Sequence, residues 1–438
     1  MNIESSEGKT NGHELEKYNV NIRIAFFTIM LSIFVDVLGY SMVLPLLPEI
    51  AQIYGAEDII VGILISSNAF TALIFGPIWG KLSDIYGRKP ILVISQAGTF
   101  AAFLVLGLSD SILIIFLSRI LDGIFGGQIP VIRAYITDIT TPKTRSAEIG
   151  KITVSYALGM IFGPSLGGFL GSINWRYPAF VACGMATTSI ILTYTVVVES
   201  MPAKRREDIK KELIKKYELE GRKSIWNKGL IFRLTQLFIG FSITVLFNSS
   251  LALVMDKRYG AGPSAIGIVM TFGASFVMLY GGFLMKKVIK KFGEKAVYLF
   301  TLSLAVIVST FYPFLFEYWM VFIFVIPFGF IMAFLPPLIQ SNITKAVESD
   351  KQGTASGYST NFQSIAQSIM PLIATSYLQI GYFSLAFITL NAYELIGYTA
   401  TIFGGVLLLL GVIDLKMHPE LYAHENRKKK SKFDTNQE

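Results

Sequence analysis

The sequence predicts an all-α integral membrane protein in which twelve transmembrane helices form two pseudo-symmetric bundles of six. Of the 438 residues, 53% are hydrophobic and only 16% are charged, whereas soluble domains carry about 25% charged residues. The apolar residues are grouped in runs of roughly 18–25, the length that a helix needs to cross about 30 Å of hydrocarbon. Segments of the two halves also match at an offset of 205 residues, which indicates an internal repeat.

Twelve apolar segments account for the expected helices. The first 20 residues are polar and contain no small-residue cleavage site, so we do not expect a secretory signal. The first apolar segment is too long for the core of a signal peptide and is expected to stay in the membrane. The expected spans are 22–46, 59–82, 89–108, 112–137, 148–170, 177–198, 229–254, 265–286, 295–315, 318–340, 354–378 and 396–415.

The distribution of lysine and arginine predicts the orientation. With both chain ends placed inside, 32 of the 38 basic residues lie on the inner side or in the tails. Only Arg176, Lys257 and Arg258 lie on the outer side. Both termini are therefore expected in the cytoplasm, in a plasma (inner) membrane. The net charge of +8 follows from this bias and predicts contact with the lipid bilayer, not with nucleic acid.

The spans divide the chain into five parts. The linker between the halves is charged all round, which predicts a solvated helix at the inner leaflet or, alternatively, a regulatory or binding element. The parts are an N-terminal tail (1–21), an N-terminal six-helix bundle (22–198), a cytoplasmic linker (199–228), a C-terminal six-helix bundle (229–415) and a basic cytoplasmic tail (416–438).

The repeat relates the second helix of each half. The segment YGAEDIIVG (54–62) matches YGAGPSAIG (259–267). Glycines 11 residues apart then end the second helix in each half, and a basic turn follows. Parallel six-helix repeats are the architecture of one large class of transporters, in which the substrate binds between the halves near the midplane. Because such a repeat closes a cavity within one chain, we expect a functional monomer.

The turn GKLSDIYGRKP (80–90) concentrates charge between two apolar spans. Gly80 and Gly87 allow close backbone approach or positive φ. Asp84 and Arg88 cannot be buried unpaired at a membrane boundary. Asp138 ends the fourth helix at the same face, so we expect an Arg88–Asp138 contact that Asp84 supports. Such a contact can hold in one conformation and break in another, as a latch; an ordinary basic turn is the alternative.

Four motifs resemble those of the major facilitator superfamily, and in particular its twelve-helix drug:proton antiporters. The turn is similar to the superfamily's signature loop, LGYSMVLPLLP (38–48) to a first-helix motif, RILDG (119–123) to a fourth-helix element and GMIFGPSLGG (159–168) to the antiporter motif of the fifth helix. The second half lacks an equivalent of Asp84. The residues that match the signature loop and the antiporter motif are Gly80, Asp84, Gly87, Arg88, Lys89, Gly159, Gly163, Pro164, Gly167 and Gly168.

Charged residues inside the spans are candidates for proton coupling. Asp36, Arg119 and Asp122 are expected at similar depth, which predicts a cluster. Burial favours a protonated carboxylate and a nearby arginine favours the charged form, so changing hydration can load and release a proton. Asp36 is the first candidate, and the resemblance implies the same. Alternatively, Asp36 has a structural role, and Asp122 is a permanent partner of Arg119.

The antiporter motif predicts close helix contacts, because its glycines recur at short intervals and Pro164 permits a bend. Packing of this helix against the other half would prevent proton leak. Arg133 either extends to the cytoplasm or faces the cavity, and Arg233 is expected at the interface. The candidate substrate-cavity residues are Tyr40, Met42, Asn68, Gln128, Arg133, Gln236, Asn248, Asn361 and Gln363.

No cofactor or metal is expected, because the single cysteine is isolated and all three histidines lie in the tails. The absence of nucleophile–base pairs and nucleotide motifs predicts that the chain is not an enzyme. We therefore expect a proton-driven antiporter that exports amphipathic small molecules or drugs by alternating access. The alternative is a symporter or facilitator of a metabolite or nutrient. Tetracycline exporters are the nearest resemblance, but their acidic residues in helices three and nine are missing here.

Overall fold

A computed structural model describes residues 22–140, 142–201, 206, 228–347, 352–385 and 388–419. The predicted N-terminal tail, most of the linker and most of the basic C-terminal tail lie outside these residues. The described chain is almost entirely helical, and eleven of its helices are long and apolar enough to cross a membrane. The eleventh predicted span corresponds to α16 (Gln352–Ile380), which is 29 residues long but rich in serine and glutamine. The all-α transmembrane architecture is confirmed.

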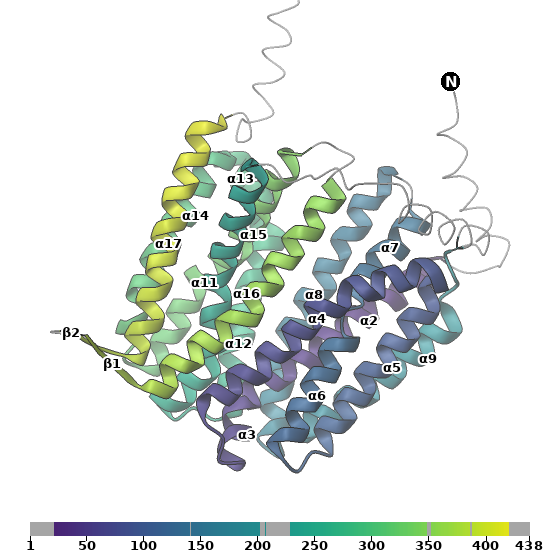
Figure 1. Cartoon of the computed structure of the whole chain (residues 1–438), viewed down its shortest axis with the longest axis horizontal. Helices are drawn as coiled ribbons and strands as arrows, with labels where there is room; N and C mark the ends of the chain where they lie inside the picture. Colours follow the sequence, from purple (N-terminus) through teal and green to yellow (C-terminus); the bar gives the residue numbers. More distant parts are fainter. Residues whose placement is uncertain are drawn as a thin grey trace, which may run out of the picture. The chain divides into compact units, whose positions relative to one another are not determined.

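The chain divides into two compact units (Figure 1). The first comprises residues 1–223 together with Ala261–Thr271, and the second comprises the remainder. This division differs from the predicted bundles because the first turns of the eighth predicted helix cluster with the first unit. The elements of the first unit are α2 (Ile22–Val43), η1 (Leu44–Leu46), α3 (Leu47–Ile53), α4 (Asp58–Tyr86), α5 (Arg88–Gly107), α6 (Ile112–Phe125), α7 (Ile129–Ile139), α8 (Pro142–Gly171) and α9 (Tyr177–Val196).

The second unit repeats the order of the first. A π-helical turn, η2, interrupts its second transmembrane helix at two glycines. Its elements are α11 (Lys228–Tyr259), α12 (Pro263–Met278), η2 (Leu279–Leu284), α13 (Met285–Phe292), α14 (Glu294–Phe311), η3 (Tyr312–Phe314), α15 (Tyr318–Lys345), α16, β1 (Tyr382–Leu385), β2 (Ile388–Asn391) and α17 (Ala392–Met417). The antiparallel hairpin β1–β2 was not predicted, because its strands are only four residues long.

The same helix pairs pack together in both units. In the first unit α2 packs on α8 and α5 packs on α9; in the second, α11 packs on α16 and α14 on α17. These are the first with the fifth and the third with the sixth helix of each unit. The repeat also extends to the turns, because Gly55 and Gly260 both have φ near +60°. Glycine tolerates this conformation at little cost, so both turns can end their helices sharply.

Helix four differs most from its prediction. One continuous helix was expected over 112–137, but α6 ends at Phe125 and α7 begins at Ile129. Gly126 and Gly127 stand at the break, and Pro130 follows within the first turn of α7. Proline has no N–H and its ring collides with the carbonyl four residues earlier, so it starts a helix readily but interrupts one.

Candidate functional site

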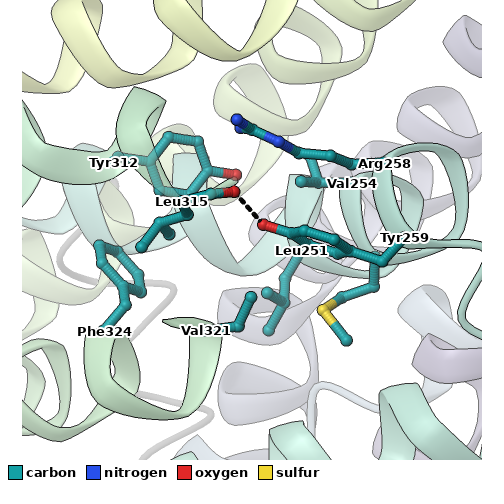
Figure 2. A pocket seen from close by; sticks show the side chains of 9 residues that line it. Leu251, Val254, Arg258, Tyr259, Tyr312, Leu315, Val321 and Phe324 are labelled. Carbon is teal, nitrogen blue, oxygen red and sulfur yellow. Dashed lines mark hydrogen bonds between the residues drawn. The ribbon is translucent and has the colours of Figure 1, made fainter. Parts of the chain in front are cut away.

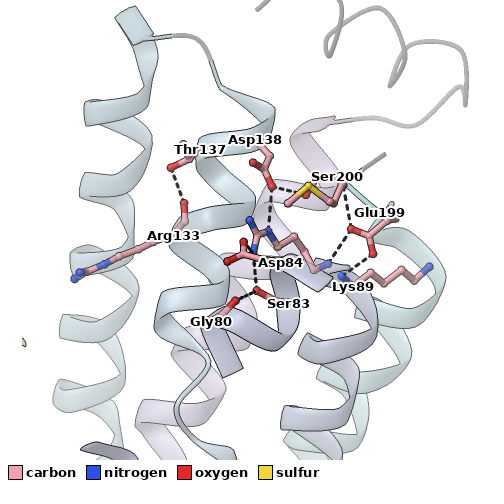
Figure 3. A network of polar contacts seen from close by, with 11 residues as sticks. Gly80, Ser83, Asp84, Lys89, Arg133, Thr137, Asp138, Glu199 and Ser200 are labelled. Carbon is pink, nitrogen blue, oxygen red and sulfur yellow. Dashed lines mark hydrogen bonds and ion pairs between the residues drawn. The ribbon is translucent and has the colours of Figure 1, made fainter. Parts of the chain in front are cut away.

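The turn between α4 and α5 forms a buried ionic network, which we call the Arg88 cluster (Figure 3). The guanidinium of Arg88 contacts Asp84 Oδ1 at 2.6 Å and Asp138 Oδ2 at 3.1 Å. It also donates to Ser83 Oγ at 2.6 Å. The expected Arg88–Asp138 contact is therefore present, and only 5% of Arg88 is exposed. Because an unpaired buried charge is costly, this network depends on every partner staying in place.

Glu199 completes this turn and was not predicted. Its carboxylate accepts hydrogen bonds from the backbone N–H of Arg88 (2.8 Å) and of Lys89 (3.2 Å), the first residues of α5. A carboxylate at a helix N-terminus accepts hydrogen bonds from the free N–H groups and interacts favourably with the positive end of the helix dipole. Gly87 has φ +104°, and a Cβ there would collide with the Glu199 carboxylate. The glycine is thus required both for its backbone conformation and for this contact.

Further contacts extend the Arg88 cluster to the chain after α9. Ser200 Oγ donates to Asp138 Oδ2 at 3.1 Å, so Asp138 is held from two directions. Lys89 takes no part through its side chain, which lies over the Tyr194 ring at 5.4 Å. Gly80 contributes its carbonyl oxygen, which accepts from Ser83 Oγ at 2.6 Å. Four segments, namely α4, α5, α7 and the residues after α9, therefore meet here.

A second polar cluster lies within the first unit, on α4 and α6. The Asp122 carboxylate accepts from Asn68 Nδ2 at 2.9 Å and from Arg119 Nη1 at 3.3 Å. Both Arg119 and Asp122 are 4% exposed. The predicted pairing of Arg119 with Asp122 is therefore present, and Asn68, a candidate cavity residue, belongs to it. A buried ion pair needs such additional hydrogen bonds because desolvation of both charges is costly.

Asp36 on α2 faces this pair. Its carboxylate lies within electrostatic reach of Asp122 and of the Gln128 side chain. Tyr156 on α8 also faces Asp36. Arg119 pairs with Asp122 and not with Asp36 in this structure. The structure thus brings together the three residues predicted as the proton-coupling cluster, and it adds the amide of Gln128.

The glycines of the fifth-helix motif lie in α8. A Cβ at Gly159 would collide with Val37, one at Gly163 with Ser41 and one at Gly167 with Met42. These three glycines pack on α2 of the same unit, whereas the predicted contact with a helix of the segment 229–415 is made by Gly168. Gly168 instead meets Gly267, in the segment Ala261–Thr271 that clusters with the first unit. Pro164 lies inside α8, and its carbonyl also approaches Gly267.

The remaining candidate cavity residues occupy different environments. Met42 is fully buried, and Gln236 is buried with its Oε1 accepting from Tyr298 at 2.9 Å, so both belong to helix packing here. Asn248 is half-buried and donates to the Thr244 carbonyl. Arg133 is exposed and points away from Asp138 in Figure 3. Those that keep partly exposed side chains are Tyr40, Asn68, Asn248, Asn361 and Gln363.

An ion pair that was not predicted lies in the second unit. Arg233 was expected at the membrane interface, but it is 3% exposed and contacts Asp414 Oδ1 at 2.9 Å. Asp414, three residues before the end of α17, gives this charge a buried partner that was not predicted. An aspartate inside an apolar span is itself the signal that would have revealed the pair.

A small apolar pocket also lies in the second unit, beside the end of α11 (Figure 2). Its volume of about 10 Å³ is no more than one water molecule occupies. Tyr259 donates its hydroxyl to the Leu315 carbonyl at its rim. The pocket is therefore too small for a drug-sized molecule. It is lined by Leu251, Val254, Met255, Arg258, Tyr259, Tyr312, Leu315, Val321 and Phe324.

Comparison with known proteins assigns the family. A family model described as "Major Facilitator Superfamily" matches residues 29–371, with a second match over 234–432. The chain belongs to the major facilitator superfamily. Multidrug resistance protein 1 of Bacillus subtilis (strain 168) is 29% identical over 369 residues, covering 82% of this chain and 90% of that protein. The class H tetracycline resistance protein of Pasteurella multocida is 25% identical over 352 residues, covering 79% and 86%.

Solved structures of the superfamily share the fold. The crystal structure of the human organic anion transporter MFSD10 (TETRAN) matches with a TM-score of 0.66 at 18% identity, covering 89% of this chain and 99% of that chain. The predicted membership, drawn from the four motifs, is confirmed. The chain is thus a multi-pass membrane transporter of the major facilitator superfamily.

Proposed function

We propose that the chain is a proton-coupled antiporter that exports amphipathic small molecules by alternating access. The observation that carries this proposal is the Asp36 carboxylate, which lies inside the first unit beside Asp122 while Arg119 pairs with Asp122. With Asp36 ionised, two negative charges face one positive charge. A single proton on Asp36 makes the cluster neutral, which is the state that a low-dielectric interior favours.

The cluster also contains a hydrogen-bond donor that ionised Asp36 could use. Arg119 Nη2 is buried and has no hydrogen-bond partner among the described residues. A small shift between α2 and α6 would let this donor approach Asp36 and displace its proton. Proton loading and release would then alternate with helix movement, as antiport requires. Asp122 keeps its bond to Asn68 throughout and holds Arg119 in position.

The aromatic residues of the second unit support an apolar or amphipathic substrate. Phe272, Phe276, Tyr280 and Phe330 follow one another at ring-centroid distances of 5.1 to 5.7 Å. All four are only partly buried. Partly exposed rings on adjacent turns present flat apolar surfaces that accept molecules of different shape. The printed names of the relatives, which refer to multidrug and tetracycline resistance, support the same substrate class.

We further propose a plasma-membrane location, cytoplasmic termini and a functional monomer. The basic-residue bias supports the orientation, because 32 of the 38 lysines and arginines lie on the proposed inner side or in the tails. The Arg88 cluster would then lie at the cytoplasmic end of the first unit, where a latch could close the inner side.

The test uses purified protein in vesicles that contain a pH-sensitive dye. Lipophilic cations, neutral drugs and anions are added in turn, and substrate-induced proton movement is recorded for the wild type and for Asp36→Asn. We expect at least one amphipathic compound to drive proton flux in the wild type, and Asp36→Asn to lose that flux while still binding the compound. Substrate flux that ignores both pH and the mutation would contradict antiport and leave a facilitator. Proton movement in the same direction as substrate would indicate a symporter.

A further inference from the structure

The break in helix four is a built feature of the first unit. Gly126 and Gly127 separate α6 from α7, and two of the carbonyl groups at the end of α6 accept hydrogen bonds from other helices. Trp79 Nε1 on α4 donates to the Ile124 carbonyl at 2.5 Å, and Ser95 Oγ on α5 donates to the Phe125 carbonyl. Irregular backbone at membrane depth persists only where neighbours satisfy its polar groups. Because two other helices supply these donors, the break has a defined geometry.

Gln128 stands at this break and ends a buried chain of hydrogen bonds. Gln96 Nε2 donates to Thr193 Oγ1 at 3.0 Å and to Ser32 Oγ at 2.7 Å. Ser32 Oγ in turn donates to Gln128 Oε1 at 3.3 Å. Since the amide oxygen of Gln128 faces Ser32, its NH₂ group is the end that faces Asp36. Every donor between Gln96 and Asp36 therefore points toward the Asp36 carboxylate. All four chain members are at most 4% exposed.

The helix α7 joins this amide to the Arg88 cluster. Gln128 is the residue immediately before α7, and Asp138 is the penultimate residue of that helix. Ten residues of α-helix span about 15 Å. The 11-residue helix has no internal break, whereas the helix is interrupted at the two glycines before it. A displacement of Gln128 would therefore be passed along α7 to Asp138, whose carboxylate binds Arg88 and Ser200.

We propose that Gln128 is a positioning residue that links the proton state of Asp36 to the Arg88 cluster, with α7 as a lever hinged at Gly126–Gly127. The inference rests on the proposed role of Asp36. An ionised carboxylate accepts a hydrogen bond about twice as strong as a neutral one does. Protonation of Asp36 weakens its hold on Gln128, releases the hinge and loosens the Asp138–Arg88 contact. Deprotonation restores both.

The groups around Asp36 allow this assignment. Asp122 faces it from α6, Tyr156 faces it from α8, and Tyr40 on α2 interacts with the Asp122–Arg119 pair. The tyrosines are neutral near neutral pH, and Arg119 contacts Asp122. Asp36 is thus the group whose change of charge alters the interaction with the Gln128 amide.

The experiment measures the distance between the ends of α4 and α7 as a function of pH. Spin labels are placed at Lys81 and Thr137 in a Cys183→Ser background, and the full-length protein is studied in lipid nanodiscs between pH 8 and pH 5. In the wild type we expect the label distance to change with pH. Asp36→Asn should show the low-pH distance at every pH. Gln128→Leu should lose the pH response of the label distance.

A matched control excludes general damage from a lost buried hydrogen bond. Tyr298→Phe removes the hydroxyl that bonds the Gln236 amide at 2.9 Å in the second unit, far along the chain from Asp36. This variant should keep the pH response of the labels. The proposal would be overturned if the label distance in Gln128→Leu still changes with pH as in the wild type. It would also be overturned if the wild type shows proton flux but no change in label distance. If Asp36→Asn retains full proton flux, the proposed function itself fails, which is a separate result.

Discussion

The turn before α5 in the first unit and the turn before α14 in the second unit have the same backbone conformation. The residues that follow them have opposite charges. Gly87 has φ +104° and Gly293 has φ +83°, and each is followed directly by the first residue of a helix. That residue is Arg88 in the first unit and Glu294 in the second. Arg88 pairs with Asp138 at the end of helix four, and Glu294 pairs with Lys345 at 2.7 Å at the end of α15.

The second unit therefore also has an ion pair between its third and fourth helices, the Glu294–Lys345 contact. The absence of an Asp84 equivalent predicted an incomplete turn there, but the third and fourth helices of that unit are joined by an ion pair of reversed polarity. The comparison teaches that the repeat conserves the position of the link and not the sign of its charges.

The surroundings of the two pairs differ more than their geometry. Besides Asp138, buried Arg88 has three further partners, namely Asp84, Ser83 and the Glu199 carboxylate on its backbone. The Lys345 side chain is 40% exposed and that of Glu294 is 20% exposed. Buried networks depend on every partner, whereas surface pairs contribute about 0–1 kcal/mol. The Arg88 cluster is thus suited to act as a latch, whereas the Glu294–Lys345 pair is a weak contact.

The largest difference is expected when one charge is removed from each pair. Arg88→Leu leaves Asp138 buried without its partner, and such losses cost about 3–5 kcal/mol. We expect a marked fall in thermal stability and the loss of most transport. Lys345→Met should cost no more than about 1 kcal/mol. Thermal unfolding in detergent and vesicle flux measure both; equal effects in the two units would contradict the comparison.

The intramembrane ion pairs extend the comparison from the turns to the helices. Asp414→Asn leaves Arg233 with a neutral partner, which weakens a buried charged hydrogen bond and costs about 1.5–3 kcal/mol. We expect a lower unfolding temperature but unchanged pH dependence of transport. Asp122→Asn should alter the pH dependence because Arg119 then becomes available to Asp36. A pH profile of substrate-driven proton flux distinguishes a structural pair from a functional one.

The glycines sharpen the comparison at the backbone. Both Gly87 and Gly293 occupy a region of φ and ψ that other residues adopt only at a cost of about 1–3 kcal/mol. An added Cβ at Gly87 also collides with the Glu199 carboxylate. Gly87→Ala should therefore destabilise the protein more than Gly293→Ala does. If unfolding temperatures fall by the same amount in both variants, the Glu199 contact has no energetic role.

The smallest effect is expected from exchanging the charges of the second pair. In the double variant Glu294→Lys with Lys345→Glu, the pair is restored with the polarity of the first unit, so stability and flux should stay near wild type. The corresponding exchange of Arg88 and Asp138 should fail, because Asp84 would then face a like charge. Recovery of flux by the second exchange would show that surroundings do not matter.

Local signals predicted much of the first turn and of the central cluster. The spacing of Gly80, Asp84, Gly87 and Arg88 is contained within nine residues, and Arg119 and Asp122 are one helical turn apart. The break at Gly126–Gly127 also had a local signal, namely two glycines followed by Pro130, but hydropathy alone favoured a continuous helix. Periodicity measures apolar character along a span and says little about its backbone continuity.

Distant contacts were missed for a different reason. Glu199 lies 111 residues from Arg88, and Arg233 lies 181 residues from Asp414. The carboxylate of Glu199 follows the last helix of its bundle and has no spacing that ties it to α5. Likewise, Gln96 and Ser32 are ordinary polar residues until helix packing places both beside Gln128.

The sequence by itself determined the membrane-spanning character, the repeat, the family motifs and the presence of acids within spans, because each depends on composition or on spacing within a few turns. The tertiary structure decided which buried polar groups meet. A charge or amide inside a membrane must find a partner, but the partner is chosen by which helices pack together. This is why Arg233 has a buried ion-pair partner, Glu199 caps α5, and Gln128 connects Asp36 to α7.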